Sequence, residues 1–246
     1  MLPDISTPCY VYTLDAMLDH IDTVSSIFKS RFNISYAIKS NPNAALIKHL
    51  KPHINLLDAS SIGEVEVALQ AGYSPSEISF SGPAKRLFEL ERAASLPGLK
   101  VVCESVSEMQ TLNKLAEQKQ SNIDILLRLN PLNIPRSFGI NMAGAASPFG
   151  IDEETLADVA NSILPLKKLN LIGFHIYSAT NSRSIEAITE NFTIFLELFE
   201  KAATIFSTNP QYLIFGAGFG IPYTFNDEPL NLEDLAEKVL SKMEDI

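Results

Sequence analysis

Seven short apolar segments alternate with longer helical patterns, and this alternation constrains the fold more than any other feature of the chain. The segments are residues 34–38, 54–59, 77–82, 99–104, 123–129, 169–178 and 211–218. Most are almost continuously apolar, as in "IDILLRL" (123–129), and do not alternate strictly with polar residues. Continuous apolar runs indicate strands buried on both faces, as in a parallel sheet covered by helices. The pattern therefore predicts an α/β fold with right-handed crossovers.

The segments between these predicted strands carry helix signals. Ser61 precedes Glu64, and Ser105 precedes Glu108, by the three positions of a capping box, so each serine is predicted to begin a helix. The longest amphipathic pattern covers residues 184–206, where Ile, Phe and Leu recur every three or four positions.

The number of predicted strands leaves two architectures open. A closed (β/α)₈ barrel needs eight strands and commonly about 250 residues. The chain has 246 residues, and seven strands of this type precede the final helical pattern of residues 231–246. It is therefore predicted to be either an open doubly wound sheet or a barrel truncated before its eighth strand. The run "PCYVY" (8–12) precedes the alternation and is set aside as an additional N-terminal strand.

Composition narrows the classes of function. A formal charge of −10 disfavours nucleic acid as a partner, because phosphate binding requires concentrated Lys and Arg. Cys9 and Cys103 lie far apart in apolar stretches, so we expect buried free thiols and a reducing compartment. No Cys, His and acidic cluster has metal-ligand spacing. The N-terminus lacks a signal-peptide pattern and no apolar stretch reaches about 18 residues, so the expected location is cytoplasmic, without membrane contact.

In parallel α/β folds, functional residues collect where the strands end. The predicted strands end in a lysine, an aspartate, an arginine, a histidine and a glycine-rich turn: Lys39, Asp58, Arg128, His175 and "GAGFG" (216–220). Their placement at strand ends predicts a shared pocket. Taken alone, each also has a structural interpretation: a solvated lysine, a helix N-cap, an arginine that neutralises a carboxylate, and a core histidine.

These residue types suit covalent chemistry with a carbonyl cofactor. An enclosed lysine can lose its proton and form a Schiff base with an aldehyde. Backbone N–H groups after a glycine-rich strand end can approach a phosphate. The G-x-G-x-G spacing followed by Pro222 does not fit a dinucleotide fingerprint. Together with an imidazole that can stack on an aromatic ring, these features meet the requirements of pyridoxal phosphate.

The ordered motifs of the chain resemble those of the pyridoxal-phosphate-dependent decarboxylases of the alanine-racemase-like fold. That family includes the diaminopimelate, ornithine and arginine decarboxylases. The motifs are "YAIKSNPN", "LLDASSIGE", "FSGPAK", "LRLNP", "FGID", "HIYS" and "GAGFGIPY". The resemblance implies a TIM-type (β/α)₈ barrel. Racemases of the same fold continue their lysine motif in a "KANAYGHG"-like way, whereas this chain has "KSNPN", which favours decarboxylation.

The resemblance implies roles for four of the strand-end residues. Lys39 is similar to the lysine that forms the Schiff base with pyridoxal 5'-phosphate, which makes it the implied catalytic residue. His175 resembles the histidine that stacks on the pyridine ring. Asp58 and Arg128 match polar residues that lie beside the cofactor and the lysine.

Further residues are implied to bind the cofactor phosphate. Ser178 resembles a serine near the phosphate, and Gly216, Ala217 and Gly218 resemble the phosphate-binding glycine turn. The implied activity is decarboxylation of an L-amino acid or amino-acid conjugate. The alternative is a non-catalytic pyridoxal-phosphate-binding protein of the homeostasis type.

Two substitutions depart from the pattern of the family. Tyr177 stands where diaminopimelate and ornithine decarboxylases usually carry glycine. With "GFGIPY", this resembles the branch that serves siderophore, antibiotic or exopolysaccharide pathways. Ala217 replaces the middle glycine of the usual turn, which is a strained substitution if the position needs a positive φ.

Larger parts of the family pattern have no counterpart in the sequence. The glutamate that faces the pyridine nitrogen, in an E-P-G-R-like motif, and the C-terminal β-domain are absent. We therefore predict a fragment, in which residues 1–30 form a strand and helix normally associated with the β-domain and residues 31–246 form an incomplete cofactor-binding barrel. Such a chain is expected to bind the cofactor weakly and turn over slowly or not at all. The resemblance implies a homodimer for the full-length protein.

Overall fold

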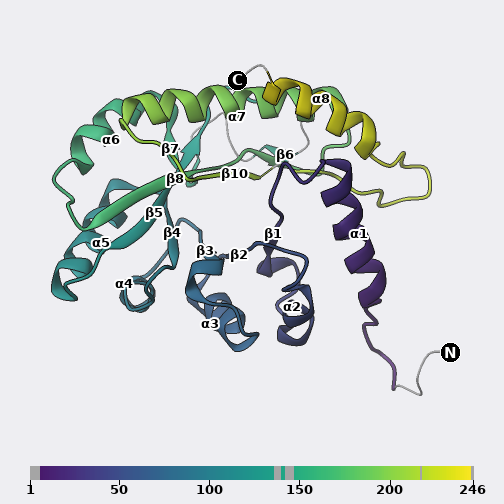
Figure 1. Cartoon of the computed structure of the whole chain (residues 1–246), viewed down its shortest axis with the longest axis horizontal. Coiled ribbons are helices and arrows are strands. Elements are labelled where there is room, and N and C mark those ends of the chain that lie inside the picture. Colours follow the sequence, from purple (N-terminus) through teal and green to yellow (C-terminus); the bar gives the residue numbers. More distant parts are fainter. Residues whose placement is uncertain (1–5, 136–139, 142–146, 217, 245–246) are drawn as a thin grey trace.

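The computed structural model describes residues 6–135, 140–141, 147–216 and 218–244. Seven parallel strands form a curled sheet with helices packed around it (Figure 1). The strands are β1 (Ser35–Ala37), β2 (Leu56–Ala59), β3 (Ile78–Phe80), β4 (Lys100–Cys103), β5 (Ile123–Asn130), β8 (Leu169–Tyr177) and β10 (Tyr212–Gly216). All seven predicted strands are therefore present, most of them one or two residues shorter than the apolar runs.

The order of the strands decides between the two predicted architectures. Along the sheet it is β1-β2-β3-β4-β5-β8-β10, so each of these strands pairs with the next one along the chain. A doubly wound sheet reverses its strand order at a switch point, whereas sequential order is that of a βα barrel. The sheet is thus the curled wall of a barrel. In the described part of the chain, it is open between β1 and β10.

Three two-residue strands were not predicted. They are β6 (Ile140–Asn141), β7 (Ile151–Asp152) and β9 (Ala179–Thr180). β7 pairs with the end of β5, and β6 pairs antiparallel with β9. Strands of this length contain no repeating apolar period, so sequence patterning cannot reveal them.

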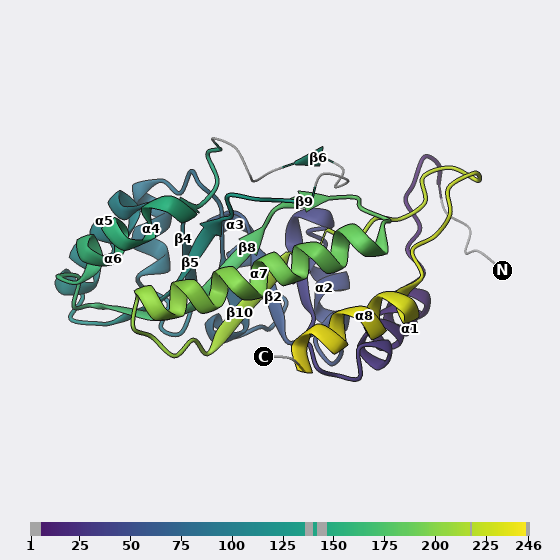
Figure 2. The same cartoon turned by 90° about the horizontal axis from the view of Figure 1, so that it is seen from above.

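Eight α-helices and three short 3₁₀ turns are present among the described residues. The helices are α1 (Leu14–Ile27), α2 (Ala44–Leu50), α3 (Ile62–Gln70), α4 (Leu87–Ala93), α5 (Val106–Gln118), α6 (Leu156–Ile163), α7 (Ile185–Ile205) and α8 (Leu232–Glu244). The 3₁₀ turns are η1 (Ile38–Ser40), η2 (Pro75–Glu77) and η3 (Glu153–Thr155). α7 corresponds to the longest predicted helix. It contacts α8, which in turn contacts α1, and Figure 2 shows these helices along one side of the sheet.

Two predicted capping serines begin their helices directly after strands. Ser61 Oγ accepts a hydrogen bond from the backbone N–H of Glu64 at 3.2 Å, and Ser105 Oγ accepts one from that of Glu108 at 3.2 Å. Glu64 Oε2 reaches the backbone N–H of Ser60 at 2.7 Å, one residue before the cap. These caps satisfy N–H groups that a helix start leaves unpaired, and they fix the chain where β2 and β4 end.

The N-terminal expectations differ from the structure. Residues 8–12 form no strand, and Tyr10 is 91% exposed. This segment lies before α1, and no described strand pairs with it, so its apolar residues are left in solvent. Cys9 is accordingly exposed and not buried as predicted, whereas Cys103 is buried in β4. Both cysteines are free.

Within the described ranges, no helix is both long and apolar enough to cross a membrane.

Candidate functional site

The strand ends bring the predicted polar residues to one mouth of the curled sheet. An apolar layer inside the sheet consists of Val102, Leu126 and Ile172, with Ile214 packed against it. Because side chains alternate along a strand, residues two positions further on point to the same side. Glu104, Arg128 and Gly216 occupy those positions on β4, β5 and β10 or directly after them. His175 on β8 is in register with Arg128 on one side and with Ile214 on the other.

Lys39 lies in η1, directly after β1. Its Nζ lies 5.5 Å from the centroid of the Tyr177 ring, which is on β8 two residues after His175. The positive charge of Lys39 also acts on Asp58 and His175. The side chain therefore extends across the mouth toward β8. It is exposed and not enclosed, which differs from the enclosed amine expected from the sequence.

Asp58 lies on β2 and is half-buried. Its Oδ1 accepts a hydrogen bond from Ser79 Oγ at 3.1 Å. Burial raises the pKa of Asp58, while hydrogen bonds from Ser81 and Ser79 and the charges of Lys39 and Arg128 act in the opposite direction. Asp58 thus faces the site and is not simply a helix N-cap, since Ser61 caps the helix that follows.

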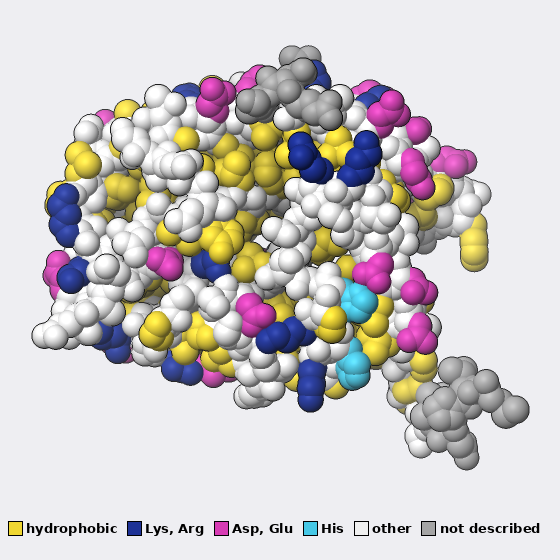
Figure 3. Space-filling model, viewed as in Figure 1, with side chains coloured by type: hydrophobic (Ala, Val, Ile, Leu, Met, Phe, Trp, Pro, Cys, Tyr) yellow, Lys and Arg dark blue, Asp and Glu magenta, His cyan; other side chains and the backbone are white. Residues whose placement is uncertain are grey.

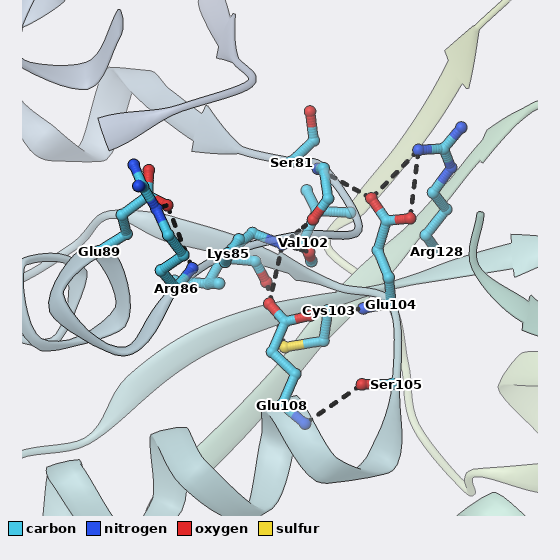
Figure 4. A network of polar contacts seen from close by, with 12 residues as sticks. Ser81, Lys85, Arg86, Glu89, Val102, Cys103, Glu104, Ser105, Glu108 and Arg128 are labelled. Carbon is cyan, nitrogen blue, oxygen red and sulfur yellow. Dashed lines mark hydrogen bonds and ion pairs between the residues drawn. The ribbon is translucent and has the colours of Figure 1, made fainter. Parts of the chain in front are cut away.

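Arg128 is buried and held by a carboxylate. Its Nη1 donates to Glu104 Oε1 at 3.1 Å and to Oε2 at 3.4 Å (Figure 4). Glu104 also accepts from the backbone N–H groups of Gly82, at 2.8 Å, and Gly150, at 3.1 Å. The Arg128 guanidinium lies 4.5 Å from the centroid of the Phe149 ring. Arg128 thus neutralises the carboxylate of Glu104, as its structural interpretation predicts.

Lys85 is a residue that sequence reasoning missed, although it belongs to the "FSGPAK" motif. Its side chain is almost fully buried, and Nζ lies 2.8 Å from Glu108 Oε1 (Figure 4). Nζ also donates to the carbonyl oxygens of Gly82, at 2.8 Å, and Val102, at 2.7 Å. Burial raises the pKa of Glu108, and the nearby Lys85 ammonium opposes this. These contacts fix the turn after β3 beneath the site.

His175 is buried, and its Nδ1 has no hydrogen-bond partner among the described residues. Burial, followed by the positive charges of Arg128, Lys39 and Lys85, lowers the pKa of His175 to about 3. The imidazole is therefore neutral near pH 7. An unpaired buried nitrogen costs about 1–3 kcal/mol, so this position fits a polar ligand that would pair with it or displace it.

The glycine turn begins at Gly216, which the Tyr177 side chain approaches closely. A Cβ at Gly216 would overlap the Tyr177 ring and lie 2.9 Å from the Ile176 carbonyl oxygen. Gly218 has a φ of +67°, a conformation that favours glycine. Ala217, the remaining predicted member of the turn, lies outside the described residues. Backbone N–H groups of a turn with a residue at positive φ can bind an anion.

Ser178 follows β8 and lies beside this turn, because Tyr177 is in register with Gly216. Ser178 is fully buried, and its Oγ donates to Asn191 Oδ1 at 2.9 Å. Asn191 is a fully buried residue of α7 that the sequence analysis did not identify.

The residues present fit pyridoxal phosphate. Lys39 supplies an amine at the mouth, and neutral His175 supplies a planar ring without a repulsive charge. Gly216, Gly218 and Ser178 are the residues that would hold the phosphate. No group of three His, Cys, Asp or Glu side chains in the described ranges could hold a metal ion.

Comparisons with known proteins show the family of the chain. Residues 14–246 match the family model of the pyridoxal-dependent decarboxylases, pyridoxal binding domain. The L-glutamyl-[BtrI acyl-carrier protein] decarboxylase of Niallia circulans is 28% identical over 95% of this chain and 54% of its own length. The 2-[(L-alanin-3-ylcarbamoyl)methyl]-2-hydroxybutanedioate decarboxylase of Staphylococcus aureus is 27% identical over 96% of this chain and 60% of its own length.

Solved structures that resemble this chain are also decarboxylases. The crystal structure of diaminopimelate decarboxylase from Helicobacter pylori, complexed with L-lysine, superposes with a TM-score of 0.82 at 25% identity. The alignment covers 98% of this chain and 61% of that one. The chain thus spans between 54% and 61% of the length of these relatives. The predicted alanine-racemase-like barrel is confirmed, and the chain belongs to the pyridoxal-binding domain family of the pyridoxal-dependent decarboxylases.

Proposed function

We propose that the protein carrying this chain decarboxylates an L-amino acid or an amino-acid conjugate with pyridoxal 5'-phosphate, and that Lys39 binds the cofactor aldehyde. The observation that carries the proposal is the position of the Lys39 ammonium. It lies 5.5 Å from the Tyr177 ring, at the mouth shared with His175 and the Gly216 turn. Membership of the family supports the same function.

Pyridoxal phosphate, when bound, joins an amine through its aldehyde carbon and accepts the electron pair left when a carboxylate departs as carbon dioxide. Lys39 would supply the amine that holds the aldehyde, and its Nζ would take up or release a proton when a substrate amine enters. Asp58, whose charge acts on the same mouth, orients that ammonium. Arg128 is held by Glu104 and adds a fixed positive charge beside Asp58.

His175 and the glycine turn would hold the cofactor in place. The imidazole is buried and neutral, so it can lie flat against an aromatic ring without carrying a charge into the site. Gly216, Ala217 and Gly218 would offer backbone N–H groups to the phosphate, and Ser178 would offer its hydroxyl. All eight candidate site residues that were identified from the sequence therefore have a role in this proposal.

The substrate that we propose is an amino acid or a conjugate of one. The names of two relatives describe decarboxylation of a glutamyl group on a carrier protein and of an alanine-derived conjugate. Tyr177, which lies at the mouth, favours the branch of the family that serves siderophore, antibiotic or exopolysaccharide pathways. Figure 3 shows hydrophobic side chains along a hollow between the part of the molecule with α7 and the part with α2 and α3.

We further propose a homodimer and a cytoplasmic location for the protein. The loop after the glycine turn exposes three large apolar residues: Ile221, Tyr223 and Phe225. Neighbouring apolar residues of this kind mark surfaces that another protein surface covers. Residues 31–246 form the proposed cofactor-binding unit, with residues 1–30 as the segment that associates with a further domain.

The proposal is tested first by cofactor binding. Pyridoxal phosphate added to the purified chain is expected to give the absorption band of a protein-bound imine. Lys39→Ala abolishes the band, whereas the matched control Lys48→Ala, an exposed lysine on α2, keeps it. Reduction with borohydride should then label the peptide that contains Lys39. A colourless wild-type chain at saturating cofactor would overturn the proposal.

Decarboxylation is tested separately, in the longest protein that carries this chain. Carbon dioxide release is measured with basic amino acids and with conjugated diamino acids. Release that disappears with Lys39→Ala is the expected result. A cofactor band without release from any of these substrates would instead favour the non-catalytic cofactor-binding alternative.

A further inference from the structure

Ser178 and Asn191 form a buried pair whose hydrogen bonding is incomplete. Both side chains are fully inaccessible to solvent, and Ser178 Oγ donates to Asn191 Oδ1 at 2.9 Å. Asn191 Nδ2 is buried and has no acceptor among the described residues. The pair therefore uses the one proton of the serine, while two amide protons of the asparagine stay unused.

This arrangement has a consequence for any anion at the glycine turn. Phosphate oxygens only accept hydrogen bonds, so a serine that gives its proton to Asn191 cannot donate to a phosphate. The two ends of a carboxamide have nearly the same shape. A half-turn of the Asn191 amide places Nδ2 where Oδ1 now lies, and Nδ2 then donates to Ser178 Oγ. The serine proton becomes available to a third group.

The position of the pair indicates which group this is. Ser178 directly follows Tyr177, which is in register with Gly216. α7 also packs against the end of β10, where the Phe192 and Phe215 rings stack at 5.1 Å between centroids. Asn191, adjacent to Phe192, is thus held at the strand end that carries the glycine turn. The amide cannot withdraw to solvent, because it is fully buried.

We propose that Asn191 is a positioning residue that converts Ser178 into a donor toward the phosphate of the cofactor. In the anion-bound arrangement, Asn191 Nδ2 donates to Ser178 Oγ, and the Ser178 hydroxyl donates to a phosphate oxygen. In the anion-free arrangement, the Ser178 hydroxyl donates its hydrogen bond to Asn191 Oδ1. The proposal rests on the proposed function, because it requires pyridoxal phosphate at this mouth.

The experiment compares two ligands that differ only in the phosphate. The chain is titrated with pyridoxal phosphate and with pyridoxal, and the ratio of the two Kd values measures what the phosphate contributes. Asn191→Leu, of similar size, is expected to lower this ratio several-fold while the affinity for pyridoxal stays the same. Asn191→Asp, which accepts but does not donate in its ionised form, is expected to lower it more, by about tenfold or beyond. A purely structural role would lower both affinities together and leave the ratio unchanged.

The Asn191 substitution is repeated in a Ser178→Ala variant, which separates positioning of the serine from other effects. In Ser178→Ala, the ratio is already low, and adding Asn191→Leu is expected to lower it no further. Equal losses with and without the Ser178 hydroxyl, or an unchanged ratio in Asn191→Leu, would overturn the proposal. Asn191→Leu decides the question if the aspartate variant does not fold. Thr189→Val, which removes another buried hydroxyl without a described partner from α7, is the matched control and should keep the wild-type ratio.

The outcomes for the wild-type chain separate this proposal from the proposed function. Binding of neither ligand contradicts the proposed function and with it the role of Asn191. Binding of both ligands with equal affinity contradicts the phosphate site and with it the role of Asn191, but leaves Schiff-base formation at Lys39 standing. A strong preference for pyridoxal phosphate that survives Asn191→Leu contradicts only the role of Asn191.

Discussion

The two sides of the mouth are built differently. On the β3–β5 side, buried charges are paired: Arg128 with Glu104, and Lys85 with Glu108. On the β8–β10 side, His175 Nδ1, Ser182 Oγ and Asn191 Nδ2 are buried without a hydrogen-bond partner among the described residues.

This difference separates scaffold from binding surface. A paired buried charge network is costly to disturb and therefore holds a fixed geometry. Unpaired buried polar atoms have a free-energy cost in the absence of a ligand, and a ligand that pairs with them recovers it. We infer that the β3–β5 side positions the chain and that the β8–β10 side receives the cofactor.

The largest expected effect on stability comes from breaking the Lys85–Glu108 pair on the β3–β5 side. Lys85→Met leaves Glu108 buried without its counter-ion, and this is expected to cost about 3–5 kcal/mol of the free energy of unfolding. The double variant Lys85→Met/Glu108→Gln removes both charges and should recover much of the loss. Urea unfolding monitored by circular dichroism measures both. A loss below about 1 kcal/mol for the single variant would show that the pair does not hold the scaffold.

The second effect is the pH dependence of stability that His175 causes on the β8–β10 side. The pKa of His175 is lowered to about 3 in the folded protein, so between this value and the unfolded value near 6.5 the unfolded chain binds more protons. The contribution of His175 is therefore present above pH 6.5 and is lost as the pH falls toward 3. Between pH 7 and pH 5, the wild type is expected to lose about 2 kcal/mol more than His175→Gln. Equal losses in urea unfolding at the two pH values would contradict the neutral, buried imidazole.

The third effect follows from adding a side chain at Gly216. Gly216→Ala places a Cβ against the Tyr177 ring and the Ile176 carbonyl, and overpacking of this kind costs about 1–3 kcal/mol. Affinity for pyridoxal phosphate should fall as well. Adding Tyr177→Gly removes the ring and should restore part of the stability, as measured by thermal melting. An additive loss in the double variant would mean that the ring is not the obstacle.

The smallest effect concerns the contact of Lys39, which follows β1, with Tyr177 on the β8–β10 side. The Lys39 ammonium lies 5.5 Å from the Tyr177 ring, a separation at which a cation–π contact contributes about 0.5–1 kcal/mol at an exposed site. A double-mutant cycle with Lys39→Met and Tyr177→Leu should give this coupling in the free energy of unfolding. Tyr177→Phe keeps the aromatic face and should retain most of it. A coupling of zero would remove Tyr177 as a partner of the lysine.

The sequence predicted the features that follow a local rule. Continuous apolar runs gave all seven strands of the main sheet, and serine caps gave the starts of α3 and α5. The ends of those strands then indicated which polar side chains share the mouth. Lys39 and His175, which lie far apart in the sequence, do act on one another electrostatically.

Other features depend on contacts that no local spacing encodes. Asn191 looks like any polar residue of an amphipathic helix, and only packing of α7 against the sheet brings it to Ser178. Lys85 and Glu108 lie on different loop–helix units, so their pairing is equally hidden. Residues 8–12 differ from the predicted strand for a related reason, because an apolar run becomes a strand only where another strand pairs with it.

The close approach between Gly216 and Tyr177 links two positions that are not neighbours in the sequence. A large ring at 177 excludes any side chain at 216, while a residue without a ring at 177 relaxes that exclusion. Sequence change at these two sites is therefore expected to be correlated, and an engineer who redesigns one of them has to choose the other at the same time.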